Sequence, residues 1–211
     1  MLKLAAKKSG IFHISCDTQY EVTATFMRLQ EFYECPSKTI RGKFFTHADF
    51  MDDYASRHGN FTYCLDWGGF NVPGHVARDF FRLFNWEKLS KRERELKFIL
   101  SEALNEYERF YVIGTYATAY IDHELSHAFW YLHENYQRQM LSLIDKLTIQ
   151  KSMRRTLLRM GYDEQQVPDE IQAYLTTSSP KELEDNFKMR TIGRAAMPFR
   201  KEFQKHKKQE F

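Results

Sequence analysis

Residues that turn the chain or break a helix are scarce in this sequence. Nine glycines and five prolines occur among 211 residues, whereas 16% of the residues are aromatic, with 18 Phe and 12 Tyr. A sandwich of many short strands needs frequent turn residues, so this composition disfavours it. Hydrophobic residues make up 43% and charged residues 28%, as in ordinary globular proteins. We therefore expect long helices around an aromatic core.

The spacing of apolar residues predicts an α+β fold that is predominantly helical, with a small β-sheet in a single domain. Strands are expected at 11–16, 61–67 and 109–116, the last being the most strand-like segment. Helices are expected at 18–33, 46–58, 73–84, 90–107, 117–132, 134–147, 149–160 and 169–177. Gly161 is expected to end a helix, and Pro198 is expected to interrupt the C-terminal segment. The predicted organisation is a domain at residues 1–185 and a basic tail at 186–211.

The positive charge is concentrated in that tail. The whole chain has a formal net charge of +3, but residues 186–211 hold eight basic and two acidic side chains. Such a tail is usually a solvated helix, and contact with nucleic acid is the alternative. No apolar run reaches the roughly 20 residues that span a bilayer. The three cysteines form neither a disulfide framework nor a zinc knuckle. We therefore expect a cytoplasmic protein with no membrane partner.

One motif in the chain carries recognisable chemistry. Residues 123–127 read His-Glu-Leu-Ser-His, and the segment around them is predicted to be helical. His123 and His127 then lie one turn apart on one face, so both imidazoles can bind one Zn²⁺. Glu124 lies about 100° round the helix, where its carboxylate can reach a water that the zinc activates. The motif therefore predicts a zinc cofactor, with Glu124 as the catalytic base.

A closed zinc site needs a third protein ligand, and the sequence offers two main candidates. His133 occupies the position of the last histidine in the metzincin pattern His-Glu-x-x-His-x-x-Gly-x-x-His. That pattern needs glycine where this chain has Trp130, and an uninterrupted helix turns His133 about 240° away from His127. Glu170, on the predicted helix 169–177, is the second candidate. Glu164 and Asp169 are the next candidates if neither binds the metal.

The motif followed by Glu170-x-x-Ala173 resembles the gluzincin branch of the zinc metallopeptidases. The strand at 109–116 is also similar to the zincin arrangement, in which an edge strand borders the cleft. The resemblance covers residues 109–177 and matches nothing in the first hundred residues. It implies a zincin-like core with His123, His127 and Glu170 as zinc ligands. It also implies that Glu124 acts as general base and general acid.

The chain departs from the gluzincin pattern at one position. Many gluzincins have an aspartate four residues after the ligand glutamate, where it holds the first histidine, and here Tyr174 stands in that place. Tyr174, Asp169 and Asp122 are therefore candidates for orienting the ligands. Tyr116 and Tyr174, together with Tyr120, are candidates for a phenol that stabilises the developing oxyanion.

Three hypotheses for function follow from this reasoning. The first is a zinc peptidase that hydrolyses peptide or amide bonds of a peptide or protein substrate through a metal-activated water. The second is a catalytically silent protein of zincin fold that binds or regulates a partner. The third is a DNA-associated metallopeptidase similar to the SprT-like proteins, whose basic extension would resemble the tail at 186–211. The retained Glu124 favours the first hypothesis over the second, because zinc binding alone does not require that carboxylate.

Overall fold

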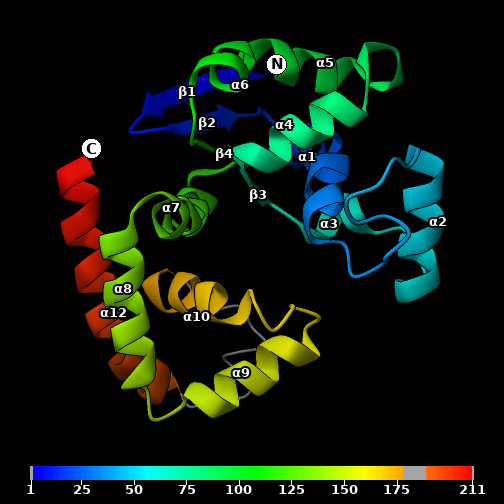
Figure 1. Ribbon diagram of the computed structural model, residues 1–211. Helices are drawn as coiled ribbons and strands as arrows, with labels where there is room; N and C mark the ends of the chain where they lie inside the picture. The colour runs from blue at the N-terminus through cyan, green and yellow to red at the C-terminus, as the bar shows by residue number, and fades with distance from the viewer. Residues whose placement is uncertain (1, 178–188, 211) are drawn as a thin grey trace. The chain divides into compact units, whose positions relative to one another are not determined.

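The computed structural model describes residues 2–177 and 189–210, and it has the predicted α+β class (Figure 1). The contacts between residues divide the chain into two compact units, Met1–Ile121 and Asp122–Phe211. The first unit contains the sheet, and the described part of the second is helical. In the described segments, no helix combines the length and the apolar character that crossing a bilayer requires.

A four-stranded mixed sheet forms the centre of the first unit. Its strands are β1 (Lys3–Lys8), β2 (Ile11–Ser15), β3 (Gly69–Pro73) and β4 (Tyr111–Thr115), in the spatial order β1-β2-β4-β3. The central pair, β2 and β4, is parallel, and both outer pairs are antiparallel. The strong prediction at 109–116 is confirmed by β4, which is buried along its whole length. Its predicted place at the edge of the sheet is wrong, because β4 lies between β2 and β3.

Two strands differ from the sequence prediction. The segment 61–67 was expected to be a strand, but it contains the short helix α3 (Tyr63–Asp66), and the strand begins later, at Gly69. The Thr62 hydroxyl donates to Asp66 Oδ2 at 2.7 Å, a bond that closes one helical turn. The edge strand β1 was not predicted, because five of its six residues are Lys or Ala. It forms a hairpin with β2 through Ser9 and Gly10, which both have positive φ.

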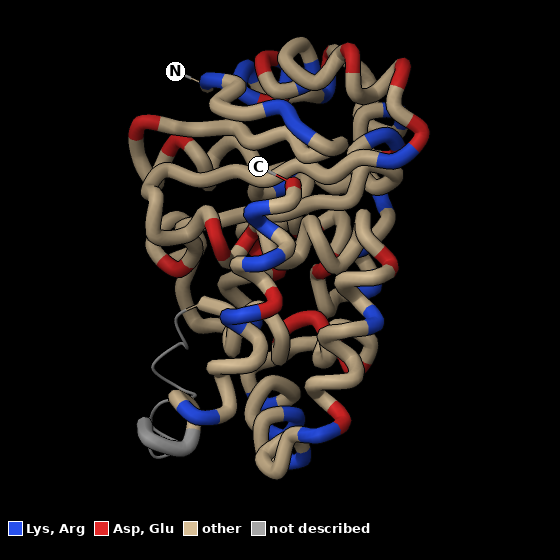
Figure 2. The backbone as a smooth tube through the Cα atoms, turned by 90° about the vertical axis from the view of Figure 1, so that its left-hand side faces the viewer, with Lys and Arg blue, Asp and Glu red and all other residues tan. Residues whose placement is uncertain are grey.

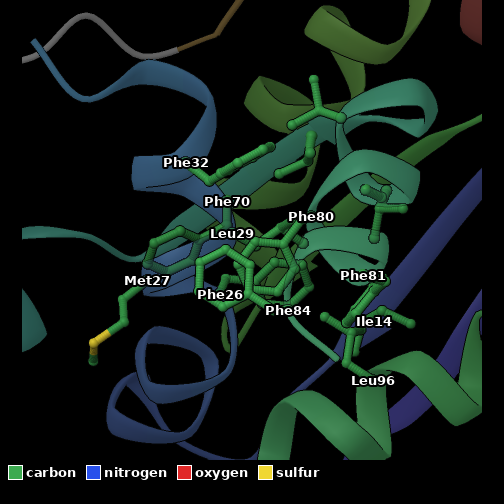
Figure 3. Packing of buried hydrophobic residues seen from close by; sticks show 14 of the residues in the cluster. Ile14, Phe26, Met27, Leu29, Phe32, Phe70, Phe80, Phe81, Phe84 and Leu96 are labelled. Atoms are coloured by element: carbon green, nitrogen blue, oxygen red, sulfur yellow. The ribbon is translucent and has the colours of Figure 1, made fainter. Parts of the chain in front are cut away.

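Six α-helices and one 3₁₀ turn complete the first unit. They are α1 (Gln19–Glu34), α2 (His47–His58), α3, α4 (Gly74–Leu83), η1 (Trp86–Lys88), α5 (Lys91–Ile99) and α6 (Ser101–Glu106). The predicted aromatic core is present where α1 and α4 meet, with Phe26, Phe32, Phe80 and Phe84 packed together (Figure 3). Gly114 of β4 allows Phe26 to approach closely, since a Cβ there would lie 2.3 Å from the ring.

Among its described residues, the second unit contains the larger part of α7 (Thr118–Leu132), which starts in the first unit, and four further helices. These are α8 (Glu134–Asp145), α9 (Gln150–Arg159), α10 (Val167–Thr176) and α12 (Met189–Glu210). Helix α9 ends at Arg159 with Met160 as its C-cap, and Gly161, with φ of 100°, follows the cap and ends the helix as predicted. Within this unit α12 packs against both α8 and α10.

The expected interruption at Pro198 is wrong, because α12 continues through it. A proline inside a helix removes one backbone hydrogen bond and clashes with the preceding turn. Four side chains at helical spacing offset this cost by burying one face of α12: Ile192, Ala196, Phe199 and Phe203. The packing of that face therefore overrides the local preference of proline. The beginning of the predicted basic tail, residues 186–188, lies outside the described residues.

Candidate metal centre

Two helices of the second unit bring the candidate zinc ligands together. His123 and His127 lie one turn apart on α7, and Glu170 lies in the first turn of α10 after Pro168. One donor atom from each of the three residues falls within 4.8 Å of the others. The Nε2 atoms of His123 and His127 are 3.3 Å apart, and Glu170 Oε1 is 3.8 Å from His127 Nε2. The residues chosen from the sequence are thus neighbours in the fold.

These distances fit a zinc ion. Histidine nitrogens bind zinc at 2.0–2.1 Å, and two such nitrogens in a tetrahedral site are therefore about 3.3 Å apart. The two Nε2 atoms already have that separation. The carboxylate oxygen of Glu170 is about half an ångström farther from His127 Nε2 than this separation, and all three donor atoms lie within 4.8 Å of one another. Two imidazoles and one carboxylate are also a usual donor set for this metal.

The opposite ring nitrogens of both histidines are held by hydrogen-bond partners. Asp169 Oδ1 is 2.9 Å from His127 Nδ1, and the Thr177 hydroxyl oxygen is 3.3 Å from His123 Nδ1. A histidine that binds a metal through one nitrogen commonly donates from the other to a carboxylate or another oxygen. Both rings therefore present Nε2 to the shared position, which is the arrangement a metal ligand requires.

Asp169 is itself held in place by a buried network. Gln172, one turn further along α10, donates to Asp169 Oδ1 at 2.8 Å. The Tyr136 hydroxyl donates to the Gln172 side-chain oxygen at 2.9 Å, and Gln172 also lies 3.4 Å from the Ser126 hydroxyl. Gln172 and Ser126 are completely buried. The network fixes the carboxylate that orients His127.

The histidines differ strongly in their electrostatic environment. Burial disfavours the charged form of His127, but the carboxylates of Asp169, Glu170 and Glu124 outweigh it and raise its pKa to about 10. Burial and the neighbouring charge of His127 lower the pKa of His123 to about 3. Without a metal, His127 is therefore the charged member and His123 the neutral one. The surplus of carboxylates favours a cation at the shared position.

The remaining predicted residues have varied positions. Glu124 is only 4% exposed, and its charge acts on His127, so it belongs to the same cluster. The Tyr174 ring lies 5.0 Å from the His123 ring, and its hydroxyl is 2.5 Å from that of Tyr162. Asp122 accepts a hydrogen bond from Lys207 at 2.5 Å. Tyr116 belongs to the first unit, where its hydroxyl is 3.5 Å from that of Tyr120.

The other candidate ligands have different partners. His133 lies in a separate group with His206 and Glu210. Glu164 forms an ion pair with Arg154, with Nη2 and Oε1 2.5 Å apart. Neither residue falls in the group of His123, His127 and Glu170 among the residues that the structure describes.

Two residues of the site were missed in the sequence. Thr177 was expected only as the end of a helix, and Gln172 was given no role. Thr177 lies seven residues after Glu170, two turns along the same helix face, and Gln172 lies three residues after Asp169. This periodicity was the available signal.

The basic side chains of α12 are partly engaged within the second unit. Lys207 pairs with Asp122, Lys205 lies 3.3 Å from Glu202, and Arg200 donates to the Thr177 carbonyl oxygen at 3.0 Å. Acidic residues interrupt the basic ones along the end of the chain (Figure 2). No family model, curated protein or solved structure matches the sequence or the fold.

Proposed function

We propose that the chain binds one zinc ion through His123, His127 and Glu170 and hydrolyses peptide or amide bonds. The observation that carries this proposal is the convergence of three donor atoms, with 3.3 Å between the two Nε2 atoms and a hydrogen-bond partner on each Nδ1. Histidines that serve only in packing need neither Nε2 atoms that face each other nor a hydrogen-bond partner on each Nδ1. The likeness to gluzincins supports the class of reaction, and the geometry supports the choice of ligands.

In this proposal Glu124 moves the proton. Zinc supplies Lewis acidity, which strengthens water as a nucleophile and polarises the scissile carbonyl. The Glu124 carboxylate accepts a proton from the attacking water and then donates it to the departing amine nitrogen. Asp169 and Thr177 hold the two imidazoles in orientation. Tyr174, whose ring borders His123, is the phenol proposed to stabilise the oxyanion.

The direct test replaces Glu124 with glutamine. Glu124→Gln keeps the shape of the side chain but removes its basicity, so zinc stays bound while peptide hydrolysis falls by a factor of about 10² to 10⁴. Glu164→Gln is the matched control, since Glu164 pairs with Arg154 and lies outside the cluster. Cleavage of a peptide library and zinc content are measured on all three proteins. Equal hydrolysis by the wild type and Glu124→Gln would exclude Glu124 as the base.

A second candidate is a zinc protein that regulates a partner without catalysis. Three members of the cluster are nearly buried, with exposed fractions of 3% for His127, 4% for Glu124 and 8% for Glu170. Closed zinc sites are typical of structural roles, whereas catalytic sites keep one position open. Zinc-loaded protein that cleaves no member of the library would support this candidate and overturn the peptidase proposal.

A further inference from the structure

A second group of metal-binding side chains lies elsewhere in the second unit. His133 connects α7 to α8, and His206 and Glu210 lie one turn apart near the end of α12. One donor atom from each falls within 4.8 Å of the others. His133 Nδ1 is 3.8 Å from Glu210 Oε1, and the two histidine rings are 4.8 Å apart.

This group is distinct from the first one, although His133 directly follows α7, which carries His123 and His127. His133 follows His127 by six residues, which corresponds to about 240° of rotation and about 9 Å along the helix axis. Its backbone N–H donates to the Phe129 carbonyl oxygen at 2.9 Å and closes the last turn of α7, and its own backbone is extended, with φ of -119° and ψ of 98°. His133 is thereby directed toward α12 rather than toward His127.

The surroundings of His206 lack a polar partner for one ring nitrogen. Its Nε2 atom is buried and has no hydrogen-bond partner in the part of the chain that the structure describes. The ring is flanked by Phe129 at 4.7 Å and by Tyr136 at 5.0 Å between centroids. A buried nitrogen without a partner costs free energy. Coordination of a cation by its lone pair would remove this cost.

We propose that His133, His206 and Glu210 form a second zinc site, which fastens the end of α12 to the junction of α7 and α8. Two neutral imidazoles and one carboxylate suit a borderline divalent metal, and zinc accepts all three donors at about 2.0–2.2 Å. No two of the donor atoms are more than 4.8 Å apart, so binding requires any of these distances to close by at most about 1.5 Å. Side-chain rotation in His206 and Glu210 provides such a movement.

The site is structural in this proposal. Glu210 is in the last turn of the last helix, and the contacts of α12 with α8 and α10 hold it within the second unit. A metal shared by the helix end and His133 reduces fraying of that end. Because the metal binds only the folded arrangement, it stabilises that arrangement by mass action. This proposal does not depend on the peptidase proposal, since the two groups share no residue.

Zinc stoichiometry tests it on the full chain. Metal-free protein is titrated with zinc alone, and bound zinc is measured by metal analysis after dialysis for wild type, His206→Gln, Glu210→Gln and His127→Gln. We expect two zinc ions per wild-type chain and one in each variant. Glu202→Gln is the control, because it removes the same charge from the same helix outside the group. It should still bind two.

Each other outcome has one meaning for this site. If the wild type binds a single zinc and both His206→Gln and Glu210→Gln still bind it, the second site is overturned. If that zinc is lost only in His127→Gln, the result also supports the first site. A single zinc lost in His206→Gln and Glu210→Gln but kept in His127→Gln would support the second site and overturn the first. No bound zinc in folded wild type would overturn both.

Hydrogen exchange provides a second readout, whose main measurement is made on the wild type. Addition of zinc to the wild type should slow amide exchange in the last two turns of α12 by at least about tenfold. The same addition to Glu210→Gln, whose changed side chain lies in the last turn of α12, should leave that exchange unaltered. Equal protection in both proteins would overturn the proposal.

Discussion

Zinc binding to His123, His127 and Glu170 is expected to release about one proton per ion at pH 7. Three carboxylates raise the pKa of His127 to about 10, so its ring is almost fully protonated at that pH. His123, with a pKa near 3, is already neutral. A metal ligand must be deprotonated, and zinc therefore displaces a proton from His127 alone.

The magnitude follows from linkage between zinc and protons. Below the pKa of His127, each increase of one pH unit weakens the competition of protons with zinc for the ring tenfold. This corresponds to about 1.4 kcal/mol of zinc-binding free energy. The apparent zinc affinity should therefore rise about tenfold from pH 6.5 to 7.5 and again to pH 8.5. If both histidines had to lose a proton, the rise would be about a hundredfold per unit.

Calorimetry measures the proton directly. Zinc is titrated at pH 7 into the Glu210→Gln protein, which lacks the proposed second site, in two buffers that differ in ionisation enthalpy. The difference in apparent enthalpy gives the number of protons released. In Asp169→Asn the partner at 2.9 Å loses its charge, so the pKa of His127 falls and fewer protons are released. Affinity alone is a poor readout here, because loss of the carboxylate also weakens the ligand. Release of no proton, or of two, would refute the assignment of charges.

Three further outcomes test the site and the fold. Glu170→Ala should weaken zinc binding at the first site by at least about tenfold, roughly 1.4 kcal/mol, in a competition assay with a chromophoric chelator. Gly114→Ala should destabilise the first unit by about 1–3 kcal/mol in denaturant unfolding, since its Cβ would meet the Phe26 ring at 2.3 Å. Glu93→Ala should cost about 3–5 kcal/mol in the same assay, because it leaves the Arg28 guanidinium buried without its carboxylate, from which it is 2.5 Å away. A decrease in unfolding free energy of less than about 0.5 kcal/mol would contradict the packing around Gly114 in the first variant. The same small decrease would contradict the role of the ion pair in the second variant.

Much of the fold could be predicted from the sequence because the apolar residues of most helices recur at helical spacing. The helices α1, α2 and α8 begin and end within about two residues of the expected positions. One failure comes from tertiary pairing and the other from a local side-chain hydrogen bond. The strand β1 has no β-pattern and exists because β2 offers it hydrogen bonds. The segment 61–67 alternates like a strand, yet the bond from Thr62 to Asp66 favours a turn of helix.

The candidate site was more predictable in its ligands than in its supporting residues. The spacing of His123 and His127 fixes their common face in any helix. The position of Glu170 was inferred through the likeness to gluzincins and agrees with the geometry of the group. Thr177 and Gln172 could not be chosen by residue type, because hydroxyls and amides are frequent on helix surfaces. Their roles depend on how α10 packs against α7, which the sequence does not encode locally.

The continuity of α7 decides which third ligand can reach the histidines. A metzincin-like site would require the chain to turn sharply at Trp130, a bulky residue that strongly disfavours positive φ. No such turn occurs, since helix α7 runs on to Leu132 and the backbone N–H of His133 bonds to Phe129 as in a helix. His133 is thereby carried to the other side of α7. The third ligand of the proposed zinc site must then come from a separate helix, and α10 places Glu170 Oε1 3.8 Å from His127 Nε2.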